Sequence, residues 1–284
     1  MLQKINFFKL VITATLLLFI QQVYAGFPIG RKRAMIAPTY NYYNASQYWD
    51  KTRQLNPFPG SGKFSSHYFG IYGGFGLSDK VDFVGNLPFV YQVASQPGVI
   101  NSNGSLGDAT MGLQYLLHDF DFYKYLTFTG SLILPLYPGD QTNTKPMPGY
   151  QEVGLEGKLG FSGSTRTRLY NHYWDANVGV RRYLSSSGPT QFFFDALYGI
   201  PVSDKVKITV SLSGVNSSSP DQGFAINPFI NRHFSYLRIT PGIGFKTSEN
   251  AQIFLNVFSD ISGKNVGKGS GGSITYVVKL GTDR

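Results

Sequence analysis

Residues 81–93 read VDFVGNLPFVYQV, and their alternation decides the fold. Apolar side chains such as Phe83, Leu87 and Phe89 fall on one parity, while Asp82 and Gln92 fall on the other. Successive side chains of a β-strand point to opposite faces, so this period of two predicts a strand with one apolar and one polar face. The same alternation recurs along the chain, which makes this strand one copy of a repeated unit.

Twelve such segments, separated by turns, account for most of the chain beyond residue 34. Strands of this length suit a bilayer crossing at a tilt of about 45°, and an even number is typical of bacterial outer-membrane barrels. The sequence therefore predicts an all-β protein, a single antiparallel transmembrane β-barrel of about 12 strands. The predicted strands are 35–48, 64–77, 80–93, 106–117, 124–136, 153–163, 169–183, 190–202, 205–216, 233–247, 250–260 and 270–280.

The connections between these segments differ at the two ends of the predicted barrel. Ser78-Asp79-Lys80 and Ser203-Asp204-Lys205 are variants of one short polar turn, and 248–250, 118–123 and 164–168 are also short. The alternate connections, 49–63, 95–105, 138–152 and 217–232, are longer and rich in Pro, Gly, Asn and Ser. Transmembrane barrels have short periplasmic turns and long extracellular loops, so both termini are predicted to be periplasmic.

The N-terminal 25 residues predict export. Lys4 and Lys9 precede a short apolar run, and Val23-Tyr24-Ala25 supplies a cleavage site before Gly26. This pattern is typical of a secretory signal peptide, because the run is too short for a membrane-spanning helix. An uncleaved N-terminal anchor is the alternative. The predicted division is a signal peptide at 1–25 and an outer-membrane β-barrel domain at 26–284, located in the bacterial cell outer membrane.

Composition favours a protein in contact with lipid. Charged residues make up 14% of the chain, against about a quarter in soluble domains, and there is no cysteine. No apolar run beyond the signal is long enough for a helical span, which leaves a closed barrel as the membrane-spanning solution. The net charge is +9, but residues 31–33 form the only tight basic cluster. A solvated tail explains that cluster, so nucleic acid is not an expected partner.

A soluble exported β-protein with an apolar interior is the rival fold. Twelve strands enclose more space than side chains alone fill, and the sequence shows no insert large enough for a plug. Charges of both signs also fall on the polar parity, where water in the lumen would solvate them and cross-strand pairs can form. Replacing one of them should then alter selectivity more than folding. The predicted lumen-facing residues are Asp82, Asp108, Glu156, Lys158, Asp175, Arg181, Asp195, Lys207, Arg238 and Lys279.

Catalytic and metal-binding patterns are weak. The four histidines, His67, His118, His172 and His233, show none of the close spacings typical of metal sites. A hydrolase would need a serine and a histidine converging on the barrel wall, and interface or loop positions explain the histidines better. We therefore expect no enzyme activity, no metal and no cofactor.

Several short stretches, taken in order, resemble the outer-membrane family named for transport in the meta-pathway of phenol degradation. They are LGDATMGL at 106–113, YLRITPGIG at 236–244, and residues 256–265 ending in SGKN. The resemblance implies an outer-membrane barrel that passes small aromatic or other hydrophobic molecules. It departs at the C-terminus, where the last strand reaches Leu280 without the usual terminal aromatic that the barrel-assembly machinery reads.

Two functions follow as expectations. The first is a channel or facilitator for small, hydrophobic or aromatic solutes. The second is a surface scaffold with a closed lumen, whose extracellular loops bind a partner. The partners expected in both cases are outer-membrane lipid and the barrel-assembly machinery, with a small-molecule solute added in the first.

Overall fold

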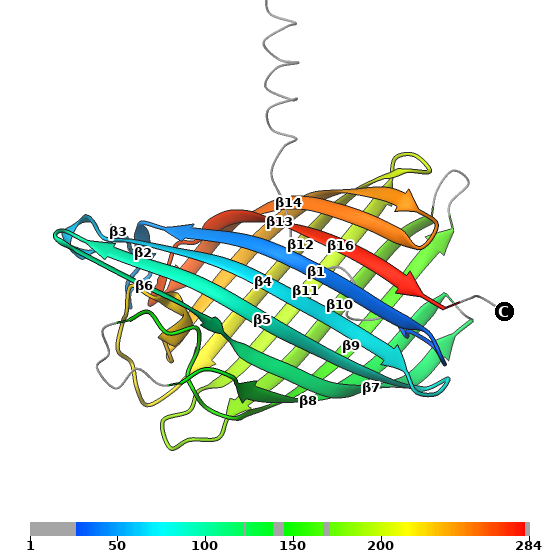
Figure 1. The fold of residues 1–284 in the computed structure, drawn as a ribbon, viewed down its shortest axis with the longest axis horizontal. Helices are drawn as coiled ribbons and strands as arrows, with labels where there is room; N and C mark the ends of the chain where they lie inside the picture. The colour runs from blue at the N-terminus through cyan, green and yellow to red at the C-terminus, as the bar shows by residue number, and fades with distance from the viewer. Residues whose placement is uncertain (1–26, 122, 139–144, 167–170, 282–284) are drawn as a thin grey trace, which may run out of the picture.

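Twelve antiparallel strands close into a barrel in the computed structural model (Figure 1). The structure describes residues 27–121, 123–138, 145–166 and 171–281, so the predicted signal peptide lies outside the described residues. Each strand pairs with its neighbours along the chain, and β1 pairs with both β4 and β16, which closes the sheet. Closure leaves the barrel wall without free strand edges and confirms the predicted fold class.

The observed strands match the predicted ones to within a few residues at most ends. They are β1 (Ala34–Ala45), β4 (Lys63–Gly76), β5 (Val81–Gln96), β7 (Asp108–Phe120), β8 (Lys124–Pro135), β9 (Gly154–Arg166), β10 (Asn171–Tyr183), β11 (Thr190–Pro201), β12 (Val206–Ser218), β13 (Phe234–Ser248), β14 (Ala251–Lys264) and β16 (Ser270–Leu280).

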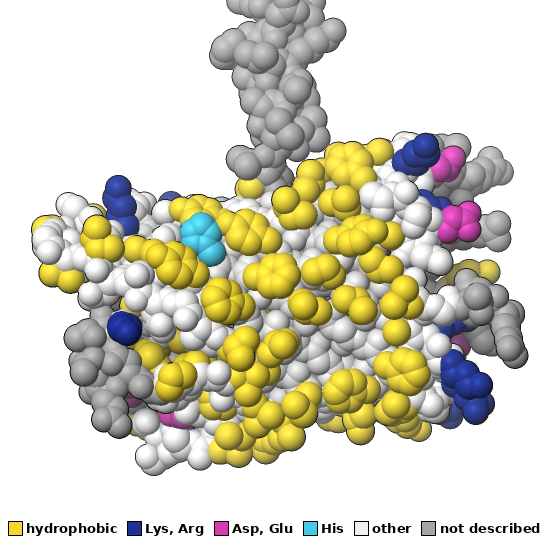
Figure 2. Space-filling model, in the orientation of Figure 1, with side chains coloured by type: hydrophobic (Ala, Val, Ile, Leu, Met, Phe, Trp, Pro, Cys, Tyr) yellow, Lys and Arg dark blue, Asp and Glu magenta, His cyan; other side chains and the backbone are white. Residues whose placement is uncertain are grey.

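The outer wall of the barrel is apolar. Outward side chains such as Phe83, Leu113 and Val210 are more than two-fifths exposed, whereas the alternate positions are mostly buried and polar. Figure 2 shows this apolar surface over β1, β4 and β5, with charged side chains gathered towards the ends of the barrel. Among the described residues, no helix is long and apolar enough to cross a membrane. The exposed apolar side chains of the wall form the kind of band that a lipid-facing β-barrel presents.

One end of the barrel carries short turns, and we call it the short-turn end. The Ser78 hydroxyl accepts hydrogen bonds from the backbone N–H groups of Lys80 and Val81, at 3.2 and 3.0 Å. Ser203 does the same for Lys205 and Val206, at 3.3 and 3.1 Å. These side-chain bonds replace backbone partners within the turn, which explains why the Ser-Asp-Lys sequence recurs there. β1 begins and β16 ends at this same end (Figure 1).

The opposite, long-loop end contains more regular structure than the sequence predicts. Residues 95–105, predicted as a loop, mostly belong to β6 (Val99–Leu106), which pairs with the end of β5 in a hairpin that projects beyond its neighbours. A small second sheet joins β2 (Gln47–Trp49), β3 (Leu55–Pro57) and β15 (Val266–Gly267). Two short 3₁₀ turns, η1 (Pro59–Ser61) and η2 (Pro228–Ile230), complete this end.

The interior is narrower than the strand count suggests. At the long-loop end Phe58, Phe64 and Phe258 are almost fully buried in one apolar cluster, joined by Phe224 and Ile226 from a loop. A second cluster at the short-turn end buries the residues Met35, Ala37, Phe254 and Val277. Although the sequence shows no insert large enough for a plug, loops fold inward and aromatic side chains occupy part of the space between the strands.

Candidate functional site

A cavity of about 420 Å³ lies inside the barrel, and we call it the chamber. Its wall combines aromatic rings with a few charged groups, the composition expected of a small-molecule site. Of the ten predicted lumen residues, three line it: Asp108, Arg181 and Arg238. The aromatic side chains in its wall are Tyr43, Tyr68, Tyr150, Tyr183, Phe229, Phe234, Tyr236 and Phe258.

Two loops from the long-loop end form the roof of the chamber. Asn227 Nδ2 donates to the Met147 carbonyl at 2.8 Å, and the Tyr150 hydroxyl donates to the Asn231 carbonyl at 2.6 Å. These bonds tie the loop after β8 to the loop after β12. Gln191 Nε2 on the barrel wall donates to the Tyr150 hydroxyl at 3.1 Å, which fixes the roof to the wall.

Asp108 meets the roof where β7 begins. Gly149 from the loop packs so closely that a Cβ there would overlap the Asp108 carboxylate, so a larger residue would displace that side chain. The buried Tyr137 hydroxyl hydrogen-bonds to Asp108. Burial, followed by the Asp108 charge, raises the pKa of Tyr137 well above its usual range, which keeps this hydroxyl a neutral donor. Asp108 thus anchors the loop as well as lining the chamber.

Arg238 on β13 and Asp260 on β14 form a buried ion pair in the chamber wall. Arg238 Nε and Nη2 donate to the two carboxylate oxygens of Asp260, at 2.7 and 3.1 Å. The guanidinium carbon lies 4.2 Å from the ring centre of Phe258 and 5.2 Å from that of Tyr236. Arg238 is 9% exposed and Asp260 2%. The expectation that water solvates this arginine is therefore wrong, because aromatic rings and a carboxylate surround it.

A second ion pair joins two of the predicted residues. Arg181 Nε and Nη2 donate to Glu156 Oε2 at 3.0 and 2.6 Å, across the neighbouring strands β10 and β9. Arg181 Nη1 also donates to Gln191 Oε1 at 3.3 Å, and its guanidinium lies 5.4 Å from the Phe193 ring centre. The predicted cross-strand pairing of opposite charges is present here. Both chamber arginines thus face carboxylates of the wall.

Five more predicted residues, Asp175, Asp195, Lys207, Lys279 and Lys158, also lie outside the chamber wall. Asn177 Nδ2 donates to Asp175 at 3.0 Å and to Asp195 at 2.9 Å, so one amide bridges two carboxylates. Lys207 Nζ donates to Gln252 at 2.9 Å and lies 5.2 Å from the Tyr173 ring centre. Lys279 is exposed near the end of β16. All five share the strand parity that alternates with the exposed apolar side chains.

Asp82 holds the segment that precedes β1 at the short-turn end. The Ile29 backbone N–H donates to Asp82 Oδ2 at 2.9 Å, and Gln114 Nε2 donates to the Phe27 carbonyl at 3.5 Å. The Phe27 ring lies 6.0 Å from that of Tyr125. Since Asp82, Gln114 and Tyr125 belong to the inward parity, residues 27–30 lie inside the mouth of the barrel. Residues 31–33 remain exposed, as predicted for the basic cluster.

The histidines do not converge on a site. His67 and His172 lie on the outer wall, where the Nδ1 atom of each is 2.8 Å from a tyrosine hydroxyl, Tyr40 and Tyr198 respectively. His118 packs against Phe120 near the short-turn end. Within the described ranges, no group of three or more His, Cys, Asp or Glu side chains could hold a metal ion.

Asp260 is the charged chamber residue that the sequence-based list omits. It is the last residue of its predicted strand, 250–260, and that strand is apolar on both faces. Phe254 and Phe258 point inward while Ile253 and Leu255 point outward, so alternation gives no clear parity. The inward set also includes the polar residues Gln252, Asn256 and Asp260, which lie two positions before and two and six positions after Phe254, and these are the signal that could have revealed the face.

Comparisons with known proteins support the fold. By sequence, the chain matches no family model and no curated protein. By structure, it resembles an outer-membrane channel from Pseudomonas putida F1, with a TM-score of 0.71, 10% identity, and coverage of 92% of this chain and 100% of that one. It also resembles the translocator domain of the autotransporter NalP from Neisseria meningitidis, with a TM-score of 0.50, 12% identity and 88% coverage of both chains. It resembles the β domain of the Bordetella autotransporter BrkA with a TM-score of 0.52, 12% identity, and coverage of 88% of this chain and 100% of that one. The chain thus has the fold of outer-membrane β-barrels.

Proposed function

We propose that the protein is an outer-membrane channel that conducts small uncharged solutes, aromatic ones in particular, without catalysing a reaction. The chamber carries this proposal, because it is a small internal cavity with many aromatic rings in its wall. The structurally similar protein from Pseudomonas putida F1 is described as an outer-membrane channel, which agrees with such a role. The ten predicted lumen residues then line or flank the solute path.

The pairing of charges in the chamber favours uncharged solutes. Arg238 and Arg181 each engage a wall carboxylate, so neither is a free cation for an anionic solute. Displacing such a partner would leave a buried charge unpaired, which is costly. Aromatic faces such as those of Tyr236 and Phe258 remain as surfaces on which a flat apolar ring can pack.

The proposed orientation has the short-turn end, with both termini, in the periplasm. An epitope inserted at Gly98, at the tip of the β5–β6 hairpin, should then be labelled by antibody on intact cells. Gly98 is suitable because a Cβ there would meet nothing within 4 Å. An epitope at Asp204, in a short turn, should be labelled only after the outer membrane is opened. Labelling of Asp204 but not Gly98 on intact cells would reverse the orientation.

Residues 27–30 restrict the channel at its periplasmic mouth in this proposal. Deleting them should raise single-channel conductance several-fold in planar bilayers, because the segment occupies space between Asp82 and Tyr125 and its removal admits water and ions. Arg33→Ala is the matched control, since this exposed side chain lies beside the segment but outside the mouth. Its conductance should equal that of the unmodified protein.

The same recordings test the channel itself. Wild-type protein should give discrete currents that added benzyl alcohol, a neutral aromatic molecule, reduces by occupying the chamber. Absence of current from both the wild-type protein and the deletion variant would contradict a channel. The roof formed by the two loops would then favour the alternative, a closed scaffold whose loops bind a partner.

A further inference from the structure

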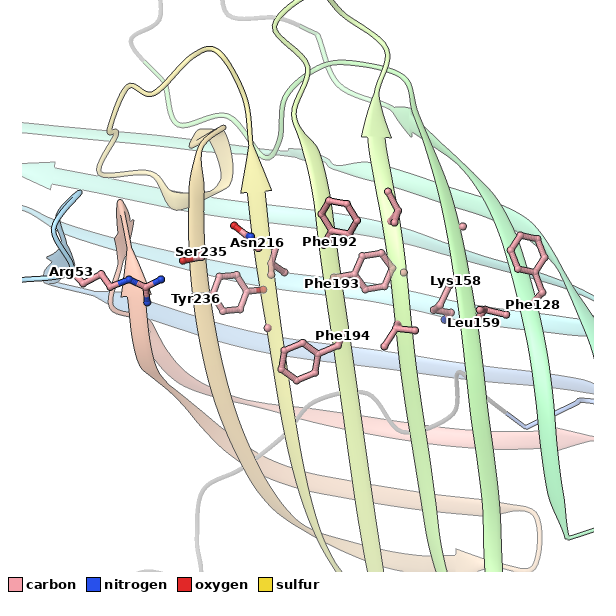
Figure 3. A pocket seen from close by; sticks show the side chains of 16 residues that line it. Arg53, Phe128, Lys158, Leu159, Phe192, Phe193, Phe194, Asn216, Ser235 and Tyr236 are labelled. Carbon is pink, nitrogen blue, oxygen red and sulfur yellow. The ribbon is translucent and has the colours of Figure 1, made fainter.

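A groove of about 870 Å³ crosses the outer wall from β8 to β13 (Figure 3). Outward side chains form its sides, and Phe192 and Val178 among them are 59% and 58% exposed, more than most apolar residues of the wall. Most of its lining side chains, such as Phe192, Val178 and Leu159, point away from the interior, while Val215 and Tyr236 border both the groove and the chamber. Its volume falls within the range of about 300–1,000 Å³ usual for small-ligand sites.

Gly157 leaves the floor of this groove open. A Cβ at Gly157 would meet nothing closer than the Phe128 ring, at 3.8 Å, so its backbone does not require glycine for lack of space. Phe128 and Leu159 border the groove on this side. The apolar surroundings and the missing side chain together create a place where a flexible hydrocarbon segment can lie against the wall.

Arg53 closes the groove at its other end, beside Ser235 and Tyr236 (Figure 3). It belongs to the turn between β2 and β3, where its backbone takes a left-handed conformation with φ of 68°. Asp50 holds that turn: its Oδ1 accepts from the Thr52 hydroxyl at 2.7 Å and from the Gln54 N–H at 2.9 Å. These hydrogen bonds lower the pKa of Asp50, and the bond from the Thr52 side chain has the largest effect. The carboxylate therefore stays ionised at neutral pH.

The turn is also fastened to the barrel, because the Asn265 N–H donates to the Asp50 carbonyl at 3.1 Å. Arg53 is exposed, and its guanidinium makes no hydrogen bond or ion pair with any described residue. An exposed arginine on a well-held turn therefore meets an apolar groove at the long-loop end of the wall. Arg182, two residues beyond Val180 on the same outer face, adds a second exposed cation near this boundary.

We propose that the groove binds lipid A, the phosphorylated glycolipid of the outer leaflet. An acyl chain of the lipid lies in the groove, and a phosphate group contacts Arg53. An apolar groove with a cation at the membrane boundary complements an amphiphile whose anionic group sits directly above its hydrocarbon. The proposal rests on the orientation given above, which places this end of the barrel in the outer leaflet. Arg recognises phosphate through paired N–H donors, which the Arg53 guanidinium offers at the end of the groove.

Native mass spectrometry of the full chain, purified in detergent and titrated with diphosphorylated lipid A, tests this proposal. One lipid A should remain bound, and Arg53→Glu should weaken its binding at least tenfold. Lys51→Glu is the matched control, because Lys51 is exposed in the same turn but does not line the groove. Gly157→Phe should also weaken binding, since the new ring fills the floor. Arg53→Gln replaces Arg53→Glu if the latter fails to fold.

Several results would overturn the lipid site. One is equal binding of phosphatidylglycerol and lipid A by the wild-type protein. Another is an equal loss of lipid A binding in Arg53→Glu and Lys51→Glu. A third is a wild-type dimer that Gly157→Phe converts to a monomer, since the groove would then be a dimer interface. Conductance should be unchanged in Arg53→Glu, because Arg53 lies outside the chamber. Failure of lipid binding with normal currents therefore refutes this inference alone, while normal lipid binding without currents refutes the channel alone.

Discussion

Arg238→Ala should lower the free energy of unfolding of the barrel by about 3–5 kcal/mol, because it leaves a buried carboxylate without its partner. Asp260 is 2% exposed. Once the arginine is gone, the remaining partner of its Oδ2 is the Gly269 N–H, at 2.9 Å. The variant also loses the contact of the guanidinium with the Phe258 ring. Urea titration in lipid vesicles, followed by tryptophan fluorescence, measures the change.

The double variant Arg238→Met with Asp260→Leu is the control for this result. It removes both charges and keeps similar side-chain volume, so most of the lost stability should return. A single variant as stable as the wild-type protein would show that water reaches this ion pair, as the sequence predicted for Arg238. A double variant as unstable as the single one would show that packing around Phe258, rather than the unpaired charge, causes the loss.

The strands and their inward faces followed from local information. In β5, Asp82 and Gln92 alternate with Phe83 and Leu87, and a period of two fixes which side chains share a face without knowledge of any neighbour. The Ser-Asp-Lys turns are equally local, because Ser78 bonds to residues two and three positions ahead. Signals of this kind gave the number of strands and most of their ends.

The loops and the N-terminal segment that occupy the barrel interior could not be predicted from the sequence, because their positions depend on contacts between distant segments. The bond from Asn227 to Met147 spans 80 residues, and that from Ile29 to Asp82 spans 53. Neither has a local pattern that would reveal it. β6 was missed for a different reason: its hairpin projects beyond its neighbouring strands, so its side chains lack the apolar alternation that marked the other strands.

Leu113→Arg should reduce the folded yield in lipid more than any substitution of an outer-wall residue by an uncharged one. Leu113 is 52% exposed on the apolar outer face, one residue from the middle of β7. An arginine near the bilayer midplane of a barrel costs about 2–4 kcal/mol, since the guanidinium must stay in hydrocarbon or disturb the lipid around it. The folded fraction, read from heat-modifiable mobility on gels after refolding into vesicles, should fall accordingly.

Thr110→Arg on the same strand is the matched control, because Thr110 points to the other face and lines the chamber. There the new guanidinium lies on the same face as Asp108, two residues away, and has polar groups and internal space around it. We expect normal folding with altered conductance. If Thr110→Arg fails to fold while Leu113→Arg folds normally, the two faces are exchanged and the apolar wall of this barrel is not its lipid surface. If both fold equally well, the barrel does not span a bilayer at this depth, because hydrocarbon would penalise one arginine and not the other.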